Sequence, residues 1–444
     1  MRTPRGAGFG LLTLATTTAA LAQQIPPRYA VTEFGAFSNG STQAHALNDL
    51  GHATGESGVG QISIGTHAFV SDLNGGLENI ETLPGVDLSA GKAINNSGQV
   101  AGDTTTFVGQ AGFTSLFRYT PGEGMVDLGR PGGQNALVID MNDAGVVLAI
   151  SWGVTRGWIH SGEGGWTDLG TLGGHTTVPH DINNAGQVVG YTYNAELDFR
   201  AFVWQDGQMQ DLGTLGGENS IAYYISDEGV VVGRSAMADG TQSAFRYAPA
   251  TGMQPLPAPA GARDIAATWV TPSGHIMGWF HDDATQRGFR YTDDSGAVDL
   301  GVDLGFPAWT SPVAMNDAGE ILLLAMNMQT YEVSSLLHTP GGGPYNLNDL
   351  LATELQWGFT SPADINDSGQ ILVSGFSVNG YRSALLTPIT PGDLDADGAV
   401  NLADLSTLLA HYGAAGASYA DGDIDADGQV TLLDLSALLS VFGS

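Results

Sequence analysis

Two acidic segments near the C-terminus contain the residues best suited to chemistry. Residues 392–413 and 422–443 are nearly the same sequence, with aspartates at loop positions 1, 3, 5 and 12, glycine at position 6 and a polar residue at position 9. Ca²⁺ is a hard cation that takes about six to eight oxygen ligands, and a short loop can aim alternate side chains at one centre. The spacing therefore predicts two calcium-binding loops.

The positions within each loop identify the expected ligands. In the first loop they are Asp393, Asp395, Asp397, the backbone carbonyl of Ala399, Asn401 (directly or through a water) and Asp404. In the second loop they are Asp423, Asp425, Asp427, the backbone carbonyl of Gln429, Thr431 and Asp434. The carboxylates of an empty loop repel one another, so we expect folding to be coupled to the binding of two calcium ions. The alternative is a pair of acidic turns without metal.

One short helix is expected to follow each loop. Leucines and an aromatic residue are spaced i, i+3, i+4, i+7 in both copies: Leu405, Leu408, Leu409 and Tyr412, then Leu435, Leu438, Leu439 and Phe442. Two such one-sided helices are expected to bury these faces against each other. Gly413 and Gly443 occupy the expected helix C-caps.

This pair of loop–helix units, residues 392–444, resembles the type I dockerin module. The resemblance implies calcium-dependent folding and docking of the carrier chain onto a cohesin-like or cell-surface protein, with the calcium ligands given above. Many cellulosomal dockerins have a Ser-Thr-like pair before the closing aspartate, where this chain has Leu402-Ala403 and Leu432-Leu433. The segment also contains no lysine or arginine, which such modules often use at the interface.

Composition excludes several classes of partner. The chain has 444 residues and a formal net charge of −32, with Lys92 as its single lysine. Nucleic acids and anionic membrane surfaces bind clustered cations, so neither is an expected partner. The chain has no cysteine, which rules out disulfides and thiol chemistry.

The N-terminus predicts export. Arg2 and Arg5 precede an apolar stretch at residues 8–21, and Ala20-Leu21-Ala22 fits a signal-peptidase site. No later segment has the roughly 18 apolar residues of a membrane span. We therefore expect residues 1–22 to be a signal peptide and the rest of the chain to be secreted, either extracellular or at the cell surface.

A repeated unit fills the chain between these two segments. It is anchored by a turn of the form Asn-(Asn/Asp)-x-Gly, whose clear copies end at Gly51, Gly98, Gly145, Gly186, Gly319 and Gly369 and whose degenerate copies end at Gly229 and Gly274. These glycines are 41 to 50 residues apart, the period of a four-stranded propeller blade. A β-branched strand follows the turn, then an alternating strand, then a strand that carries Asp-Leu-Gly.

The ends of the array predict how it closes. The eighth copy stops after its third strand at residues 382–386, while residues 29–35 resemble a fourth strand placed before the first copy. We therefore predict a mainly β protein: an eight-bladed β-propeller of four-stranded antiparallel blades at residues 23–387, closed by residues 29–34. A Pro-rich linker at residues 388–391 and a small α-helical dockerin-like domain at residues 392–444 follow. A seven-bladed ring is the alternative, and in either case we expect the propeller to be monomeric.

The units resemble the HAF extracellular repeat. The motif is present as His67-Ala68-Phe69 on a third strand, and as Arg200-Ala201-Phe202 and Ser243-Ala244-Phe245 in later copies. This resemblance covers nearly the whole propeller. It implies an exported repeat protein and no established reaction.

No catalytic motif is apparent in the repeats: the nucleophile elbow, the phosphate loop and the zinc-protease helix are all missing from the sequence. The Asp-Leu-Gly aspartates Asp127, Asp168, Asp211 and Asp299 are expected to bond loop amides. His175, His180 and Asp181 match no zinc spacing and are interpreted as loop residues. We therefore assign no catalytic residue and no cofactor-binding residue other than the calcium ligands.

Two functions follow. The favoured one is an exported, non-catalytic binding or scaffolding protein that attaches to a partner or a cell-surface assembly through the calcium module. The alternative is a dockerin-bearing carbohydrate-active enzyme, a glycoside hydrolase or polysaccharide lyase of polysaccharide catabolism. A paired acid and base in the central channel would favour the enzyme, and tryptophans on one face would favour a polysaccharide binder, the candidates being Trp152, Trp158, Trp269 and Trp309.

Overall fold

A computed structural model describes residues 25–443 except residues 39, 60–64, 163, 302–303 and 353–357. The expected signal peptide, residues 1–22, lies outside the described residues. The chain divides into compact units, and one of them is Pro27–Thr390. The other contains the chain from Pro391 onward. No helix in the described ranges has both the length and the apolar character needed to cross a lipid bilayer.

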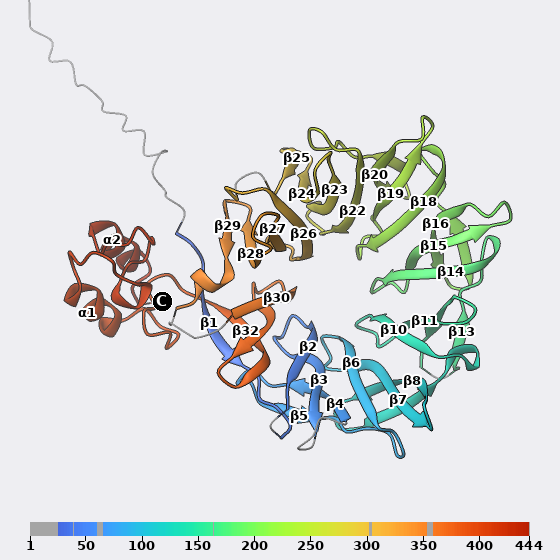
Figure 1. Ribbon diagram of the computed structural model, residues 1–444, viewed down its shortest axis with the longest axis horizontal. Coiled ribbons are helices and arrows are strands. Elements are labelled where there is room, and N and C mark those ends of the chain that lie inside the picture. Colours follow the sequence, from blue (N-terminus) through green and yellow to red (C-terminus); the bar gives the residue numbers. More distant parts are fainter. Residues whose placement is uncertain are drawn as a thin grey trace, which may run out of the picture. The chain divides into compact units, whose positions relative to one another are not determined.

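The larger unit is a ring of antiparallel sheets around a central space (Figure 1). The described residues form eight such sheets of four strands each, which confirms the predicted eight-bladed propeller over the seven-bladed alternative. We number the blades in chain order and give the innermost strand first. Blade 1 is β2 (Thr42–Leu47), β3 (Ala53–Val59), β4 (Gly65–Ser71) and β5 (Leu77–Asn79). Blade 2 is β6 (Leu88–Ile94), β7 (Val100–Val108), β8 (Ala111–Thr120) and β9 (Gly124–Gly129). Blade 3 is β10 (Ala136–Met141), β11 (Val147–Ser151), β12 (Arg156–His160) and β13 (Trp166–Asp168), and the 3₁₀ helix η1 (Pro131–Gly133) precedes it.

The remaining blades follow the same order. Blade 4 is β14 (Gly173–Ile182), β15 (Val188–Asn194), β16 (Phe199–Gln205) and β17 (Gln208–Asp211). Blade 5 is β18 (Gly216–Ile225), β19 (Val231–Met237), β20 (Gln242–Ala248) and β21 (Gly252–Pro255). Blade 6 is β22 (Asp264–Val270), β23 (Ile276–His281), β24 (Gln286–Thr292) and β25 (Gly296–Asp299). Blade 7 is β26 (Ala308–Met315), β27 (Ile321–Asn327), β28 (Val333–Thr339) and β29 (Gly342–Asn346), followed by η2 (Leu347–Leu350).

Blade 8 joins the two ends of the propeller. It consists of β30 (Gly358–Ile365), β31 (Ile371–Ser377), β32 (Gly380–Ile389) and β1 (Arg28–Glu33), with β1 outermost. β1 pairs antiparallel with β32, from Arg28 opposite Ile389 to Glu33 opposite Ala384. The prediction that the N-terminal segment completes the last blade is thus confirmed. Pro388 and Ile389 were expected in the linker but extend β32, because β1 offers them a partner strand on that side.

The hydrophobic core lies between neighbouring blades. A phenylalanine recurs on the third strand of several blades and is fully buried at Phe69, Phe117, Phe202, Phe245 and Phe289. Phe202 of blade 4, for example, belongs to the same buried cluster as Leu148 of blade 3. The repeated aromatic residue of the third strand therefore packs one blade onto the next.

The repeated Asn turns form as predicted. In blade 4 the N–H of Gly186 donates to the carbonyl of Asn183 (3.0 Å), and Gly186 has a φ of 76°. The side-chain oxygen of Asn183 accepts the N–H of Gln187 (2.9 Å). A left-handed glycine after a type I turn suits this connection because glycine has no Cβ to clash.

Each innermost strand carries a β-bulge that the sequence did not reveal. One residue is skipped in the pairing of the first two strands in every described blade: His45, Lys92, Ile139, His180, Tyr223, Thr268, Val313 and Ala363. Opposite the bulge, the backbones approach closely. A Cβ at Gly190 would lie 2.1 Å from the carbonyl oxygen of Val178, and one at Gly233 would lie 2.0 Å from that of Ile221. This close approach explains why Gly190 and Gly233, rather than larger residues, follow the paired valines.

The C-terminal unit contains α1 (Leu402–Ala410), η3 (Tyr419–Asp421) and α2 (Leu432–Ser440). Each helix is buried mainly through one leucine, Leu408 or Leu438, both fully buried. The packing is reciprocal. A Cβ on Gly392 would lie 3.2 Å from the Cα of Leu438, and a Cβ on Gly422 would lie 2.9 Å from the Cα of Leu408. Each acidic segment thus begins against the helix of the other copy.

Two expectations for these helices were wrong. Leu409, Tyr412, Leu439 and Phe442 are 52, 50, 52 and 42% exposed and are not buried between the helices. Leu408 and Leu438 pack against the start of the opposite acidic segment, and Leu405 and Leu435 are half-buried. The C-caps are His411 and Val441. Gly413 and Gly443, with φ of 85° each, lie two residues further on.

Candidate functional site

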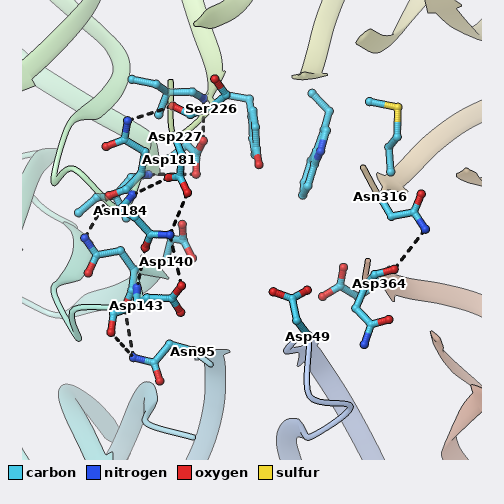
Figure 2. Close-up of a pocket in the computed structure, with 18 of the residues that line it drawn as sticks. Asp49, Asn95, Asp140, Asp143, Asp181, Asn184, Ser226, Asp227, Asn316 and Asp364 are labelled. Carbon is cyan, nitrogen blue, oxygen red and sulfur yellow. Dashed lines mark hydrogen bonds between the residues drawn. The ribbon is translucent and has the colours of Figure 1, made fainter. Parts of the chain in front are cut away.

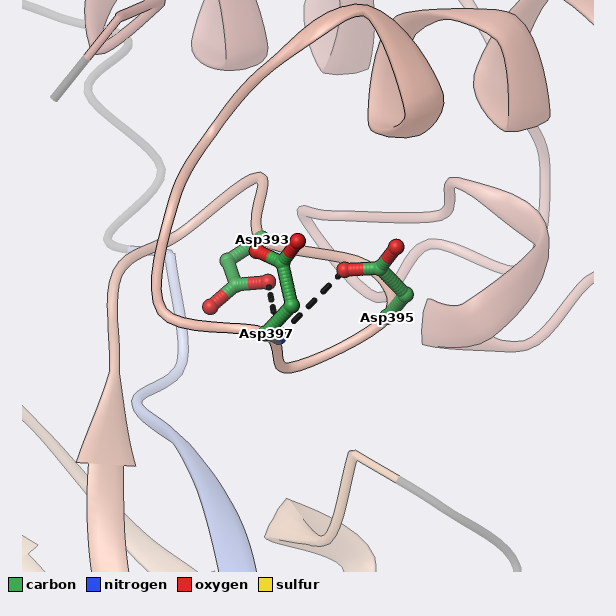
Figure 3. Close-up of side chains that lie close together, drawn as sticks. All are labelled: Asp393, Asp395 and Asp397. Carbon is green, nitrogen blue, oxygen red and sulfur yellow. Dashed lines mark hydrogen bonds between the residues drawn. The ribbon is translucent and has the colours of Figure 1, made fainter.

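The two acidic loops bring most of the predicted ligands together. In the first loop, carboxylate oxygens of Asp393, Asp395 and Asp397 lie within 4.8 Å of one another (Figure 3). In the second loop, the corresponding group is Asp423, Asp425 and Asp434. The two groups share their first two positions, and each loop turns through a left-handed glycine, Gly398 or Gly428, at position 6.

The closing aspartates bond to the backbone of their own loops. Asp404 accepts the N–H of Leu394 (2.7 Å) and the N–H of Asn401 (2.8 Å) with its two oxygens. Asp434 repeats this arrangement with Ile424 (2.7 Å) and Thr431 (2.7 Å). Each closing aspartate therefore connects the start of the loop to the N-terminus of the helix, and in the first loop it is outside the three-carboxylate group.

The remaining predicted ligands have local partners. Asn401 and Thr431 are the N-caps of α1 and α2 and accept the N–H of Ala403 (2.8 Å) and Leu433 (3.1 Å). The carbonyl of Ala399 accepts from the side-chain amide of Asn401 (3.1 Å). In the second loop, Asp427 accepts the N–H of Gln429 (2.8 Å) and lies outside the carboxylate group.

The loops concentrate negative charge in a buried setting. Asp393 and Asp404 are each 1% exposed, and Asp434 is fully buried. Burial raises the pKa of Asp393, and the neighbouring charges of Asp404 and Asp397 raise it further. Burial, followed by the charge of Asp434, likewise raises the pKa of Asp423. Residues 392–444 contain no lysine or arginine. Clustered oxygen donors without a basic neighbour are the donor set that a hard divalent cation takes.

The two helices expose a duplicated set of large apolar side chains. Besides the four residues described above, Leu402 is 73% exposed, Leu432 is 66% and Leu433 is 63%. These residues occupy the first turn of α1 and α2, directly after the N-caps. We refer to the seven residues as the helix-face patch: Leu402, Leu409, Tyr412, Leu432, Leu433, Leu439 and Phe442. Exposed apolar groups in such numbers on a small unit are typical of a binding surface.

The centre of the propeller is a cavity of about 580 Å³ at the end where the Asn turns lie (Figure 2). In most blades the turn asparagine donates its side-chain amide to the carbonyl of the next turn. Asn48 donates to Asn95 (2.9 Å), and Asn366 closes the circle by donating to Asn48 (3.0 Å). The circle is interrupted in blades 5 and 6, where Ser226 and Thr271 replace asparagine. These amides therefore connect blades.

Aspartates next to the turns, either directly after the first turn residue or two residues before it, give the cavity its charge. Eight carboxyl groups line it: Asp49, Asp140, Asp143, Asp181, Asp227, Asp317, Asp364 and Asp367. No lysine or arginine lines it in the described part of the ring. Burial raises the pKa of Asp317, as do the charges of Asp367, Glu228, Asp49 and Asp227 in that order. Anionic ligands are therefore disfavoured in the cavity.

Three of these aspartates connect neighbouring blades just after the bulge. Asp181 accepts the N–H of Ile182 (3.0 Å) in its own blade and the N–H of Ile225 (2.7 Å) in the next. Asp364 bonds to Ile365 (2.9 Å) and to Leu47 (3.1 Å) in the same manner. Burial raises the pKa of Asp364 to about 7.

The third of these aspartates, Asp140, lies beside Asp181. Burial raises the pKa of Asp140, and burial followed by the charge of Asp140 raises the pKa of Asp181 well above its usual range. This is the nearest approach to a paired acid and base in the described part of the channel. The oxygens of Asp181 are already engaged by backbone amides. The pair is thus explained by its role in joining the blades.

The other sequence candidates have structural surroundings. The Asp-Leu-Gly aspartates accept loop amides as predicted, as when Asp168 accepts the N–H of Gly170 (2.8 Å). His175 and His180, interpreted as loop residues, lie instead in β14. Trp269 stacks on Tyr224 with 4.3 Å between ring centroids and lines the central cavity. Trp152 is 51% exposed.

Sequence reasoning missed a charged cluster between blades 1 and 2. Lys92 Nζ lies 3.5 Å from His45 Nε2, which in turn lies 3.8 Å from a carboxylate oxygen of Glu56. Burial raises the pKa of nearby Asp103 to about 6, against the opposing effect of Lys92. His45 and Lys92 are both bulge residues, separated by the blade period. Their separation of 47 residues, which equals the distance between the first two turn glycines, was the signal in the sequence that could have placed them side by side.

Known proteins offer limited comparison. No family model matches the chain, and no curated protein matches it. The β-propeller domain of the trilobed protease from Pyrococcus furiosus has a TM-score of 0.46 and 9% identity, and the match covers 73% of this chain and 96% of that one. Dipeptidyl peptidase 4 from Porphyromonas gingivalis has a TM-score of 0.46 and 11% identity, covering 74% and 56%. A streptogramin B lyase has a TM-score of 0.39 and 13% identity, covering 70% and 97%. These likenesses concern the propeller fold alone.

Proposed function

We propose that this protein is an exported, non-catalytic binding or scaffolding protein, and that its C-terminal unit attaches it to a partner protein or a cell-surface assembly when two calcium ions are bound. The observation that carries the proposal is the helix-face patch. Five of its seven large apolar side chains are on two nine-residue helices, each directly connected to an acidic loop, and Tyr412 and Phe442 lie just after the C-caps.

Calcium would make the patch available by ordering the helices. Each ion would neutralise a group of carboxylates that otherwise repel one another. Asp404 and Asp434 would transmit this order, because each connects the start of its loop to the first turn of its helix. We infer that Asp393, Asp395 and Asp397 hold one ion and that Asp423, Asp425 and Asp434 hold the other.

The patch favours an apolar contact in the partner. Leu402, Leu432 and Leu433 occupy the positions where the dockerin resemblance would place small hydroxyl residues. We therefore propose a cohesin-like or cell-surface partner whose recognition surface is apolar. The enzymatic alternative receives less support, because Asp181 in the central channel is engaged by backbone amides and the sequence shows no catalytic motif.

The test is capture of proteins from the native exoproteome on the immobilised full chain. We expect one or a few partners to bind with calcium and to be released by a chelator. The double variant Leu402→Asp, Leu432→Asp should abolish capture of the partner. Its calcium uptake, measured by calorimetry, should be unchanged. Val378→Asp is the matched control, because Val378 is a 78% exposed apolar residue of the propeller. The proposal would be overturned if the double variant still captured the partner. It would also be overturned if neither loop took up calcium.

A further inference from the structure

A second cavity lies on blades 4, 5 and 6, separate from the central cavity. Its volume is about 270 Å³, near the lower end of the roughly 300 to 1,000 Å³ of small-molecule sites. Phe199 of β16 and Asn219 of β18 contribute to one side. Arg234 of β19, Gln242 of β20 and Asp264 of β22 contribute polar groups. Three consecutive blades thus build one site.

Phe199 connects this cavity to a continuous group of aromatic rings. Its ring makes edge contacts with Tyr191 (5.8 Å between centroids) and Tyr193 (6.2 Å). Tyr191 contacts His180 (5.7 Å), and His180 stacks on Tyr223 (5.2 Å, 13° between planes). None of these rings is fully buried. Each ring is half-buried, and His180 and Tyr223, at the far end of the group from Phe199, line the central cavity.

One polar atom of the cavity lacks a hydrogen-bond partner. One oxygen of Asp264, Oδ1, is buried and has no hydrogen-bond partner among the described residues. The other, Oδ2, lies 3.8 Å from Arg234 Nη1, which is longer than a hydrogen bond. A buried carboxylate oxygen without a partner is costly, so the site is arranged to receive a donor from a ligand.

The site is close to neutral. Arg234 and Asp264 are the charged residues that line it in the described part of the chain, and their charges balance. Burial raises the pKa of Tyr223, whose hydroxyl is also influenced by the charges of Arg234 and Asp264. The chain as a whole has a net charge of −32, which disfavours polyanionic ligands.

We propose that this cavity, lined by Phe199, Arg234, Gln242 and Asp264 and adjoined by the rings of Tyr191 and Tyr193 that contact Phe199, binds a neutral oligosaccharide, and we call it the aromatic groove. The inference deepens the binding role proposed above and rests on it in taking the propeller as the ligand-binding unit. A sugar ring has an apolar C–H face, which suits an aromatic surface, and an edge of hydroxyls that can donate and accept at once. Arg234 supplies donors and Asp264 supplies an acceptor for such hydroxyls, which a purely apolar ligand would leave unpaired.

The test is calorimetric titration of the full chain with neutral hexasaccharides: cellohexaose, xylohexaose, mannohexaose and laminarihexaose. We expect at least one of these neutral hexasaccharides to bind. Hexagalacturonate, which is anionic, should bind weakly or not at all. Phe199→Leu keeps apolar bulk but removes the aromatic ring, and Gln242→Ala removes an amide. Each should weaken binding by about three- to tenfold, the size expected for one ring or one hydrogen bond. Phe376→Leu is the matched control, because Phe376 is an exposed aromatic residue of blade 8 outside the groove.

The same titration is repeated with a chelator. Saccharide binding should survive chelation, because the groove lies in the propeller and not in the calcium loops. The saccharide inference and the proposed attachment can therefore succeed or fail independently. Thermal unfolding of each variant identifies loss of fold. The inference is overturned if no neutral hexasaccharide binds, or if a bound one is insensitive to both groove variants while they remain folded. Tighter binding of an aromatic peptide at the groove would overturn the assignment of ligand class.

Discussion

Gly443 donates its backbone N–H to the carbonyl oxygen of Val400, 2.8 Å away. The equivalent bond in the other direction joins Gly413 to Val430, also at 2.8 Å. Gly413 and Gly443, each three residues after the end of its helix, therefore form hydrogen bonds with the acidic loop of the other copy. Neither loop can reach its final conformation without the opposite helix, so the two copies are expected to fold and to bind metal together.

The first prediction concerns this coupling. Asp434→Asn should reduce calcium uptake at both loops, because Asp434 is fully buried and accepts backbone N–H bonds from both ends of the second loop. The loss of stability of the C-terminal unit should be about 1.5–3 kcal/mol, the size of a hydrogen bond to a charged group. Calorimetric stoichiometry of the full chain measures it. Asp427→Asn removes the same charge from an exposed position and should affect the second loop alone. Independent binding by the first loop in Asp434→Asn would contradict the coupling.

The second prediction concerns the close approach of strands at the bulge. Gly233→Ala should destabilise the propeller by about 1–3 kcal/mol, because the new Cβ would lie 2.0 Å from the carbonyl oxygen of Ile221 and the strands must separate. Gly164→Ala is the control, since a Cβ there has no atom within 4 Å. Chemical denaturation compares the two. Equal stability of both variants would show that the bulge tolerates a side chain.

The third prediction concerns ring closure. Asn366→Ser should cost about 1 kcal/mol by removing the amide that reaches the carbonyl of Asn48 across 318 residues. Serine already occupies the equivalent position in blade 5, where Ser226 retains a bond to Val230 (3.3 Å), so the turn itself should survive. Asn74→Ser, at an exposed position, should leave the unfolding midpoint unchanged. A midpoint for Asn366→Ser that matches this control would argue against a role for the amide in closure.

The fourth prediction concerns pH. The pKa of Asp364 is raised to about 7 in the folded chain from 3.8, so the folded state holds its proton longer than the unfolded state. Its contribution to stability is complete below about pH 4 and is lost as the pH rises toward about 7. Asp364→Asn should flatten this part of the stability profile, measured by chemical denaturation of the propeller at a series of pH values. Asp294→Asn, an exposed site, should leave the slope as it is. An unchanged slope in Asp364→Asn would show that another group controls it.

Much of the architecture followed from local patterns. The Asn turns with their glycines established the number of blades, and the unmatched strand at residues 29–34 predicted closure through Arg28–Glu33. The spacing of aspartates brought Asp393, Asp395 and Asp397 together because all three are within one short loop. These features depend on residues that are neighbours in the chain, where the backbone limits the conformations available.

Other features were decided by contacts between blades or between helices. The bulges that place His180 and Tyr223 against each other form between strands, and their spacing in the sequence resembles ordinary strand alternation. Asp181 was interpreted as a loop residue, but it joins two blades by accepting the N–H of Ile225, 44 residues further along the chain. The exposure of Leu409 and Phe442 depends on how the helices pack, which periodicity alone does not determine.

Taken by itself, the sequence determined the repeating strands, their turns and the two acidic loops, because each depends on short-range backbone geometry. The tertiary structure decided which side chains face one another across blades, and hence where the aromatic groove and the helix-face patch lie. Such contacts join residues that the chain keeps far apart, and only the packing of complete blades and helices brings them within reach.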